Sequence, residues 1–389
     1  MSKKRIYLDY ATTTPLDPLV EREMRPYWSR DFGNPSSLHA EGARAERALS
    51  EVRTKIARVL QAHSTEIIFT ASGTEANNLA ILGYIHALEE KSVALGGMHV
   101  IASAIEHSSV RECLINLSKR GVKVTWLSVS SEGIISVTEL EKLVTSQTVL
   151  VSIMLANNEI GTVQPVGRIS ALLKKINQTR KDLPIRLHTD ACQASLYLNV
   201  NQNRLGADLI TLDGHKMYGP KGIGILYVRR GTLVSALLYG GGQERGIRPG
   251  TENVPLAVGF AKAFELAVKR HEKESERITR LRDYFFSELD RKIPTALING
   301  SRTERLPNNI NFSLPGLHTE FTVIQLDALG IACSTKSACL EDKGESYVVK
   351  SLGRADGLEK SSLRFTLGRT STKKDIDHAI SGLQKILTQ

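Results

Sequence analysis

ADLITLDGHKMYGPKGIGILYVR, residues 207–229, holds two apolar runs on either side of a loop rich in glycine and proline. Short apolar runs bounded by such loops are typical of buried strands. Sequences of helical length and period, at 74–88, 108–120 and 167–177, separate several further runs of this kind. Those runs are EIIFT (66–70), HVIASAI (99–105), VKVTWLSV (122–129), TVLVSIM (148–154) and RLHTDA (186–191). The alternation predicts an α/β fold, with helices flanking a mostly parallel sheet.

The last three runs along the chain, at 186–191, 207–213 and 222–229, leave little room for crossover helices between them. We therefore expect an antiparallel strand on the far side of the sheet. After about residue 255 a long charged helix follows, with Ile278, Leu281, Phe285 and Leu289 on one face. Strand-like pieces at 308–314 and 362–368 and a final helix from Lys373 complete the chain. We therefore predict a large α/β domain over 15–258 and a smaller α+β domain made of 1–14 and 259–389.

The composition is that of an ordinary soluble globular chain. It has 389 residues, of which 41% are hydrophobic and 24% charged, and this excludes a mainly disordered polymer, a collagen and a disulfide miniprotein. No apolar run approaches the roughly 20 residues of a membrane span, and the start, MSKKRIYLDY, has no apolar signal region. We expect a cytoplasmic protein without a membrane partner. The net charge of +10 favours anionic partners, and it leaves direct binding of nucleic acid open.

Four cysteines are scattered through the chain, at Cys113, Cys192, Cys333 and Cys339. None forms a C-x-x-C pair, and no Cys/His spacing matches a zinc site, so we expect no metal. A long chain with few scattered thiols is typical of a reduced, intracellular protein.

The chemistry is predicted at the ends of two of the buried runs. Lys216 follows an apolar run and precedes the Gly- and Pro-rich loop, where desolvation favours a neutral amine able to form a Schiff base. Asp190 ends the run RLHTDA, and ligands of open α/β sheets bind outside such strand ends. A lysine and a carboxylate are the pair that pyridoxal 5′-phosphate (PLP) requires. Alone, a surface lysine and a capping aspartate are the plainer interpretations.

A phosphate site is predicted in FTASGTEANNLAIL (69–82), which reads as strand, turn and helix. The amides of Gly73 and Thr74 would lie at the start of the helix, where unpaired N–H groups attract phosphate. Ordinary helix capping explains the same residues equally well.

An ordered set of motifs identifies a family over nearly the whole length. The chain resembles the cysteine desulfurases, the NifS/IscS-like group of class V aminotransferases among fold-type I PLP-dependent transferases. The motifs are YLDYATTTP (7–15), FGNPSSLH (32–39), TASGTEANN (70–78), IEHSS (105–109), NNEIGTVQP (157–165), HTDACQ (188–193), DGHKMYGPKGIG (213–224), GGGQERGIRPGT (240–251), STKSAC (334–339) and SSLRFTLGR (361–369).

The resemblance implies roles for individual residues. Lys216 would be the PLP lysine, Asp190 the partner of the pyridinium nitrogen, and His107 the imidazole stacked on the ring, placed to act as acid or base. Arg364 would hold the substrate carboxylate through its planar fork, with Asn34 nearby. Further cofactor contacts would come from Gly73, Thr74, Asn158, Gln193 and His215, and from Thr251, which would reach the phosphate of the partner subunit in a homodimer.

Cys339 would make the protein a desulfurase. The resemblance implies conversion of L-cysteine to L-alanine, with the sulfur held on Cys339 as a persulfide and passed to an acceptor protein of iron–sulfur cluster assembly or tRNA thiolation. Alternatives are a selenocysteine lyase or a class V transaminase that does not use Cys339. A non-catalytic basic scaffold or RNA-associated protein is a third.

Three residues depart from the family pattern. Asp213 stands where a serine usually donates to the phosphate, and we expect it to turn away and pair with His215 or an arginine. Replacing Asp213 with serine should then tighten cofactor retention. Lys336 replaces a glycine three residues from Cys339, where it would hold a thiolate or steer an acidic acceptor. Thr12 replaces a small residue, which we interpret as a minor change.

Overall fold

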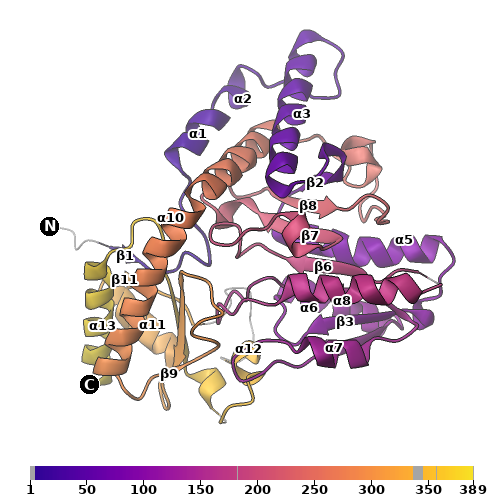
Figure 1. The fold of residues 1–389 in the computed structure, drawn as a ribbon. Coiled ribbons are helices and arrows are strands. Elements are labelled where there is room, and N and C mark those ends of the chain that lie inside the picture. Colours follow the sequence, from indigo (N-terminus) through magenta and orange to yellow (C-terminus); the bar gives the residue numbers. More distant parts are fainter. Residues whose placement is uncertain (1–4, 182, 336–344, 356, 389) are drawn as a thin grey trace.

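The computed structural model describes residues 5–181, 183–335, 345–355 and 357–388 (Figure 1). Figure 1 shows a larger part that contains the main sheet with its helices, and a smaller part in which both ends of the chain lie. The long helix α10 (Val254–Lys292) runs from one part into the other. Because α10 continues through residue 258, no chain break marks the predicted domain boundary, and the boundary stays a prediction.

The predicted apolar runs form the main sheet. Within the described residues it has seven strands in the order β2-β8-β7-β6-β5-β3-β4. Strand β8 is antiparallel to both β2 and β7, and the remaining pairs are parallel. The antiparallel strand is therefore confirmed, and it lies inside the sheet between β2 and β7. The strands are β2 (Ile67–Thr70), β3 (His99–Ser103), β4 (Lys123–Leu127), β5 (Thr148–Ser152), β6 (Arg186–Asp190), β7 (Leu209–Asp213) and β8 (Gly224–Val228).

Both faces of this sheet are covered, which explains why most of its strands are apolar runs without polar alternation. Successive residues of one strand enter opposite clusters of the core. Ile101 and Val151 pack in one cluster, whereas their neighbours Val100 and Leu150 pack in the other. The covering helices include α3 (Ala40–Leu60), α6 (Ser108–Lys119), α7 (Val137–Leu143) and α8 (Val166–Thr179). The predicted helix at 74–88 is α4 (Gly73–Asn78), a π-helical turn (Leu79–Gly83) and α5 (Tyr84–Glu90) in succession.

The smaller part is built from the residues that follow the long helix, together with the start of the chain. An antiparallel sheet has the order β12-β10-β9, with β9 (Leu297–Ile298), β10 (Asn309–Ser313) and β12 (Ser362–Thr366). Strand β1 (Ile6–Tyr7) pairs in parallel with β11 (Ile331–Ala332), so the first described residues lie against this part. Its helices are α11 (Thr319–Ala328), α12 (Tyr347–Lys350) and α13 (Lys373–Leu387).

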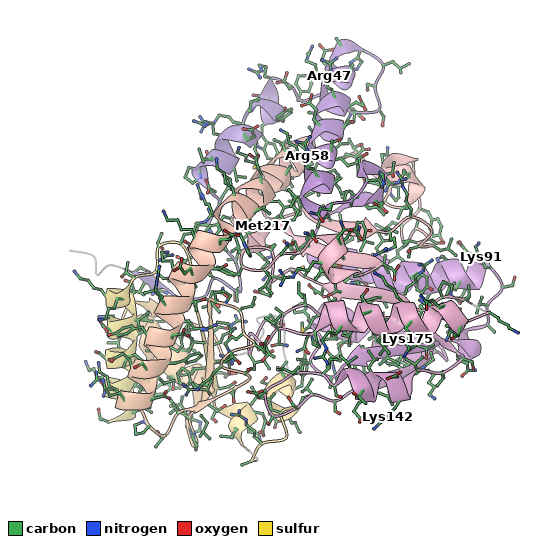
Figure 2. The ribbon with its side chains drawn as sticks, viewed as in Figure 1. Arg47, Arg58, Lys91, Lys142, Lys175 and Met217 are labelled. Atoms are coloured by element: carbon green, nitrogen blue, oxygen red, sulfur yellow. The ribbon has the colours of Figure 1, made fainter. Side chains whose placement is uncertain are left out.

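The remaining helices are short, namely α1 (Pro18–Met24), α2 (Pro26–Ser29) and α9 (Gln202–Leu205). Among the helices of the described ranges, none is both long and apolar enough to cross a membrane. The same ranges contain no group of three or more His, Cys, Asp or Glu residues placed to hold a metal ion. Basic side chains are spread over several exposed helix faces, as Arg47, Arg58, Lys142 and Lys175 illustrate (Figure 2).

Candidate active site

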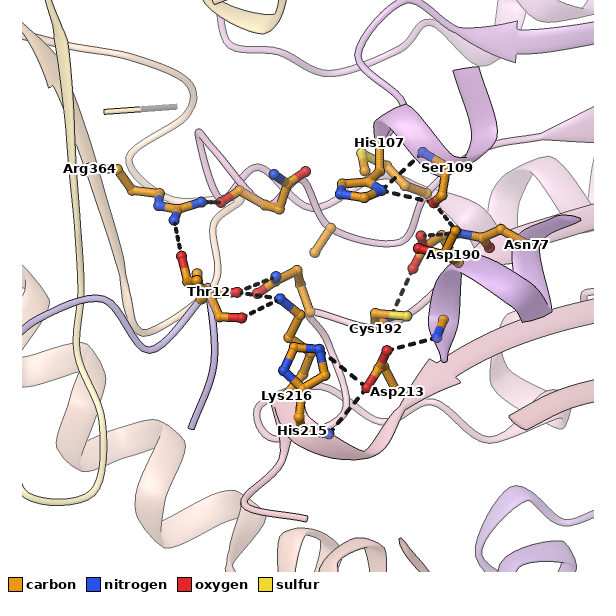
Figure 3. Close-up of a pocket in the computed structure, with 17 residues that line it drawn as sticks. Thr12, Asn77, His107, Ser109, Asp190, Cys192, Asp213, His215, Lys216 and Arg364 are labelled. Carbon is orange, nitrogen blue, oxygen red and sulfur yellow. Dashed lines mark hydrogen bonds and ion pairs between the residues drawn. The ribbon is translucent and has the colours of Figure 1, made fainter. Parts of the chain in front are cut away.

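The carboxyl ends of the parallel strands meet at one cavity of about 190 Å³, as expected for ligand sites in open α/β sheets (Figure 3). Asp190 ends β6, Asp213 ends β7, and His107 lies between β3 and α6. The cavity brings together most of the residues that the sequence predicts for the site: Gly73, Thr74, His107, Asn158, Asp190, Gln193, His215, Lys216 and Arg364.

Lys216 reaches this cavity from the 3₁₀ turn Gly214–Lys216, which directly follows β7. Its Nζ donates hydrogen bonds to the carbonyl oxygens of Ala11 at 2.8 Å and Thr12 at 2.7 Å. The amine is thus held by the N-terminal segment, whose residues Ala11 and Thr12 line the cavity (Figure 3).

Asp190 is anchored on both carboxylate oxygens. Its Oδ2 accepts a hydrogen bond from Asn77 Nδ2 at 2.7 Å, and its Oδ1 accepts one from the backbone N–H of Cys192 at 3.0 Å. The residue is only 7% exposed. Donors on both sides fix the orientation of the carboxylate.

His107 is linked to Asp190 through two polar side chains. The backbone N–H of Ser109 donates to His107 Nδ1 at 3.2 Å, and because an N–H group only donates, the neutral ring carries its proton on Nε2. The Ser109 hydroxyl lies 2.8 Å from the same nitrogen. Asn77 Nδ2 donates to that hydroxyl at 2.8 Å as well as to Asp190. Burial lowers the pKa of His107 below 6.5, although Asp190 opposes the shift, so the ring is neutral at pH 7.

Arg364 projects from β12 into the cavity with a side chain that is 2% exposed. Its Nη1 donates to the Asn158 carbonyl oxygen at 2.8 Å, and its Nη2 donates to Asp9 Oδ1 and Thr12 Oγ1, both at 2.9 Å. Its Nε is buried and has no hydrogen-bond partner among the described residues. One donor of a rigidly held guanidinium is therefore available for a ligand.

Asp213 pairs with His215, as predicted, but the expectation that it turns away from the phosphate position is wrong. Its Oδ1 lies 3.4 Å from His215 Nε2. Its Oδ2 accepts a hydrogen bond from the backbone N–H of Gly73 at 2.7 Å, and the side chain lines the cavity. The physical reason is that the Gly73 N–H, at the start of α4, has no acceptor within its own helix. A carboxylate satisfies it well.

Two predicted site residues do not line the cavity of the single chain. Asn34 is exposed, and its Oδ1 accepts a local hydrogen bond from the Ser36 backbone N–H at 2.9 Å. Thr251 is exposed just before α10. Their roles stay predictions, as do those of Lys336 and Cys339, which lie outside the described residues.

Sequence reasoning missed several residues that build the site. Asn77 and Ser109 stand inside the quoted motifs TASGTEANN and IEHSS, but nothing in those motifs reveals that their side chains meet. Thr12, interpreted as a minor change, contributes a side-chain contact that the sequence did not indicate, because its hydroxyl accepts a hydrogen bond from Arg364. The remaining unpredicted lining residues are Ala11, Met154, Ala156 and Cys192.

The three described cysteines are poor nucleophiles. Burial raises the pKa of the Cys113 and Cys333 thiols to about 12. Burial, together with the neighbouring Asp190 and Asp213 carboxylates, raises the pKa of Cys192 well above its ordinary value. Because the thiolate is the reactive form, none of these three is poised for nucleophilic attack at neutral pH.

Comparisons with known proteins identify the family of the chain. The profile of the class-V aminotransferases matches residues 6–378. The chain is 44% identical over 386 residues to the cysteine desulfurase IscS of Dictyoglomus turgidum, covering 99% of this chain and 95% of that protein. It is 40% identical over 385 residues to the cysteine desulfurase IscS of Methanosarcina thermophila, covering 99% and 92%.

Solved structures share the fold. A NifS-like protein matches with a TM-score of 0.91 and 34% identity, covering 99% of this chain and 100% of that one. SspA in complex with cysteine matches with a TM-score of 0.79 and 32% identity, covering 94% and 99%. These matches confirm the predicted fold class, and the chain belongs to the class-V aminotransferase family, in its cysteine desulfurase group.

Proposed function

We propose that this protein is a PLP-dependent cysteine desulfurase that converts L-cysteine to L-alanine and takes the sulfur onto Cys339. The observation that carries the proposal is the convergence of four groups on one cavity: the Lys216 amine, the Asp190 carboxylate, the His107 imidazole and the Arg364 guanidinium. Its relatives named cysteine desulfurase, and the structure of SspA in complex with cysteine, support the choice of substrate.

The residues present fit PLP. An amine and a fixed carboxylate face one cavity, which is also lined by an imidazole that is linked to the carboxylate through Ser109 and Asn77. Lys216 would hold the aldehyde carbon, and Asp190 would hold the proton of the ring nitrogen. The Thr74 hydroxyl and His215 offer donors to the phosphate, beside the Gly73 amide that Asp213 already contacts.

When bound, the cofactor supplies a sink for the electrons of the substrate Cα–H bond. The chain's own residues supply binding and proton transfer. Arg364 binds the substrate carboxylate with its unpartnered Nε and an Nη group. Lys216 Nζ removes the Cα proton. His107, whose Nε2 carries the proton of the neutral ring, donates and accepts protons in later steps.

Cys339 is the remaining candidate for the nucleophile, because the other three thiols are buried and held protonated. The described chain on both sides of 336–344 is tied to the cavity. Ser334 pairs with Arg364 through two backbone hydrogen bonds of 2.7 and 3.1 Å, and Ser346 Oγ donates to Glu159 Oε2 at 2.6 Å, next to Asn158.

The sulfur transfer balances as a two-electron step. The Cys339 thiolate attacks the substrate sulfur, an S–S bond forms, and the substrate C–S bond breaks with its electron pair left on carbon. A proton then completes alanine. The Cys339 persulfide passes its outer sulfur to the thiol of an acceptor protein, or to an added reductant, which releases sulfide. Lys336 would help to hold the thiolate or steer an acidic acceptor.

Two further proposals concern assembly and location. Thr251 lies exposed in the single chain, a position suited to completing the cofactor site of a second copy in a homodimer. A reducing cytoplasm, with acceptor proteins of iron–sulfur cluster assembly or tRNA thiolation, suits a persulfide donor. Because the net charge is +10, direct RNA binding would be tested by measuring how strongly the affinity for RNA falls with salt concentration.

The test is release of alanine and sulfide from L-cysteine with a reductant, for the wild type and for Cys339→Ala. We expect both products from the wild type and neither from the variant, whereas Cys113→Ala, which removes a buried thiol outside the cavity, keeps the activity. Equal release by Cys339→Ala would contradict the proposal and favour a lyase that does not use this thiol.

A further inference from the structure

Asp213 lies at the end of the cavity where Gly73, Thr74 and His215 are expected to bind the cofactor phosphate. Asp213 is 6% exposed, and its two oxygens contact different partners. Oδ2 accepts from the Gly73 N–H at 2.7 Å, while Oδ1 accepts from the His215 backbone N–H at 3.2 Å and lies 3.4 Å from His215 Nε2. The Gly73 amide is one of the donors expected for the cofactor phosphate, so the inference below rests on the proposed function.

Space around this contact is tight. A Cβ built on Gly73 would lie 2.8 Å from Cys192 Sγ and 3.2 Å from Asp213 Oδ2. The carboxylate and the thiol thus press against the backbone of Gly73 from the side of β6 and β7. One N–H group serves one acceptor at full strength, and a phosphate that approaches Gly73 therefore meets the Asp213 oxygen at the same donor.

The charges around Asp213 decide how this conflict is resolved. From its own loop it is faced by His215, and Lys216 and Lys221 act on the same imidazole. Asp190 and Cys192 lie at the end of β6, and both Asp190 and Asp213 act electrostatically on the Cys192 thiol. Asp213 also acts on His107, whose pKa it raises. Glu75 of α4 is turned to Arg248 at 2.9 Å, outside the cavity lining. On the N-terminal segment, Thr13 Oγ1 lies 3.1 Å from His215 Nδ1.

His215 is the group best placed to change its charge. Both ring nitrogens are engaged, one near Asp213 and one near Thr13. Burial lowers the pKa of His215 while Asp213 raises it, so the ring is neutral at pH 7 without a ligand. A phosphate monoester carries nearly two negative charges above about pH 6. Placed beside Asp213, this second anion favours the protonated imidazole.

We propose that Asp213 makes binding of the cofactor phosphate depend on uptake of one proton by the Asp213–His215 pair. With a proton on the pair, the His215 imidazolium lies between the Asp213 carboxylate and the phosphate. Both anions then share the donors at Gly73, Thr74 and His215. Without it, two anions compete for the Gly73 amide. Cofactor retention therefore weakens as the pH rises above neutrality.

The experiment is equilibrium dialysis of the full-length protein against PLP and against pyridoxal, which lacks the phosphate, at about pH 7 and pH 8. The ratio of the two dissociation constants isolates the phosphate, because bonding to Lys216 affects both ligands. For the wild type we expect the advantage of PLP over pyridoxal to fall about tenfold over this pH unit, the slope for one linked proton.

Asp213→Ser should bind PLP about tenfold more tightly than the wild type at pH 8, and its ratio should stay constant within about twofold. Asp213→Asn, of equal size, should show the same loss of slope and serves if the serine variant folds poorly. Glu75→Gln removes an acid from the same helix outside the cavity, and it should keep the wild-type slope.

A pH slope that is the same in the wild type and in both Asp213 variants would overturn the inference while PLP binding itself persists. A steep slope in Glu75→Gln together with flat slopes in both Asp213 variants would support it. If neither PLP nor pyridoxal binds any variant at either pH, the proposed function fails, and the inference fails with it.

Discussion

Replacing Arg364 with lysine tests the proposed carboxylate site most directly. The arginine is 2% exposed and makes three hydrogen bonds of 2.8–2.9 Å to the Asn158 carbonyl, Asp9 and Thr12. Lysine keeps the positive charge beside Asp9, so this half-buried carboxylate keeps a cationic partner. An alanine would remove that partner at a cost of about 3–5 kcal/mol in folding stability, which would obscure the effect on the substrate.

The size of the effect follows from geometry. Lysine has its three N–H donors on one nitrogen, so it cannot serve Asn158, Asp9 and Thr12 and also offer a planar pair of donors to a substrate. Losing one charge-assisted hydrogen bond costs about 1.5–3 kcal/mol. Since about 1.4 kcal/mol is tenfold, kcat/KM for L-cysteine should fall about 10- to 150-fold, with most of the change in KM.

The assay is steady-state alanine formation, compared between L-cysteine and its amide, which lacks the carboxylate charge. The variant should lose little on the amide. Arg369→Lys is the matched control, since Arg369 follows the same strand but pairs with Asp17 outside the cavity. A kcat/KM for L-cysteine within about threefold of wild type, or an equal loss on the amide, would refute the assignment.

Three other predictions concern stability and positioning. His188 is fully buried, and desolvation lowers its pKa to about 4. Between pH 4 and about 6.5 the unfolded chain binds one proton more than the folded chain, so the free energy of unfolding should fall by up to about 3 kcal/mol as the pH drops. Urea titrations of His188→Gln should show a flatter dependence of this free energy on pH. Arg53→Leu removes the cationic partner of the buried Glu244 carboxylate and should lower the free energy of unfolding, measured by heat or urea, by about 3–5 kcal/mol. Arg25→Leu, which breaks the exposed pair with Glu21, should lower it by under about 1 kcal/mol. Asn77→Ala removes the hydrogen bonds that link His107, through Ser109, to Asp190, and it should shift the pH–rate profile. Asn78→Ala should not shift the profile, because the Asn78 amide donates to the Thr74 carbonyl outside this link.

The strands and main helices could be predicted from the sequence because burial on both faces makes most strands nearly continuous apolar runs. All seven predicted runs of the main sheet became strands, and the faces of α10 follow its apolar spacing. The strand order could not be predicted in the same way. That β8 lies between β2 and β7 depends on pairing between segments far apart in sequence, and apolar runs do not encode which partner they choose.

The site divides along a similar line. Lys216, Asp190 and His107 stand at the ends of predicted strands or in recognisable motifs, so their meeting at one cavity could be anticipated. The orientation of Asp213 could not, because a short acid after a strand accepts whichever N–H comes close, and the close N–H belongs to Gly73, 140 residues away. The link through Asn77 depends equally on tertiary approach.

The segment that contains Ala11 and Thr12 has a consequence for folding during biosynthesis. It precedes the main sheet in the sequence, yet Thr12 Oγ1 accepts a hydrogen bond from Arg364, and β1 pairs with β11, which follows the whole main sheet. Domains generally fold in the order in which they are made, but here the first strand must wait for nearly the whole chain. A nascent or truncated chain that ends before β12 lacks Arg364 and therefore has no complete pocket.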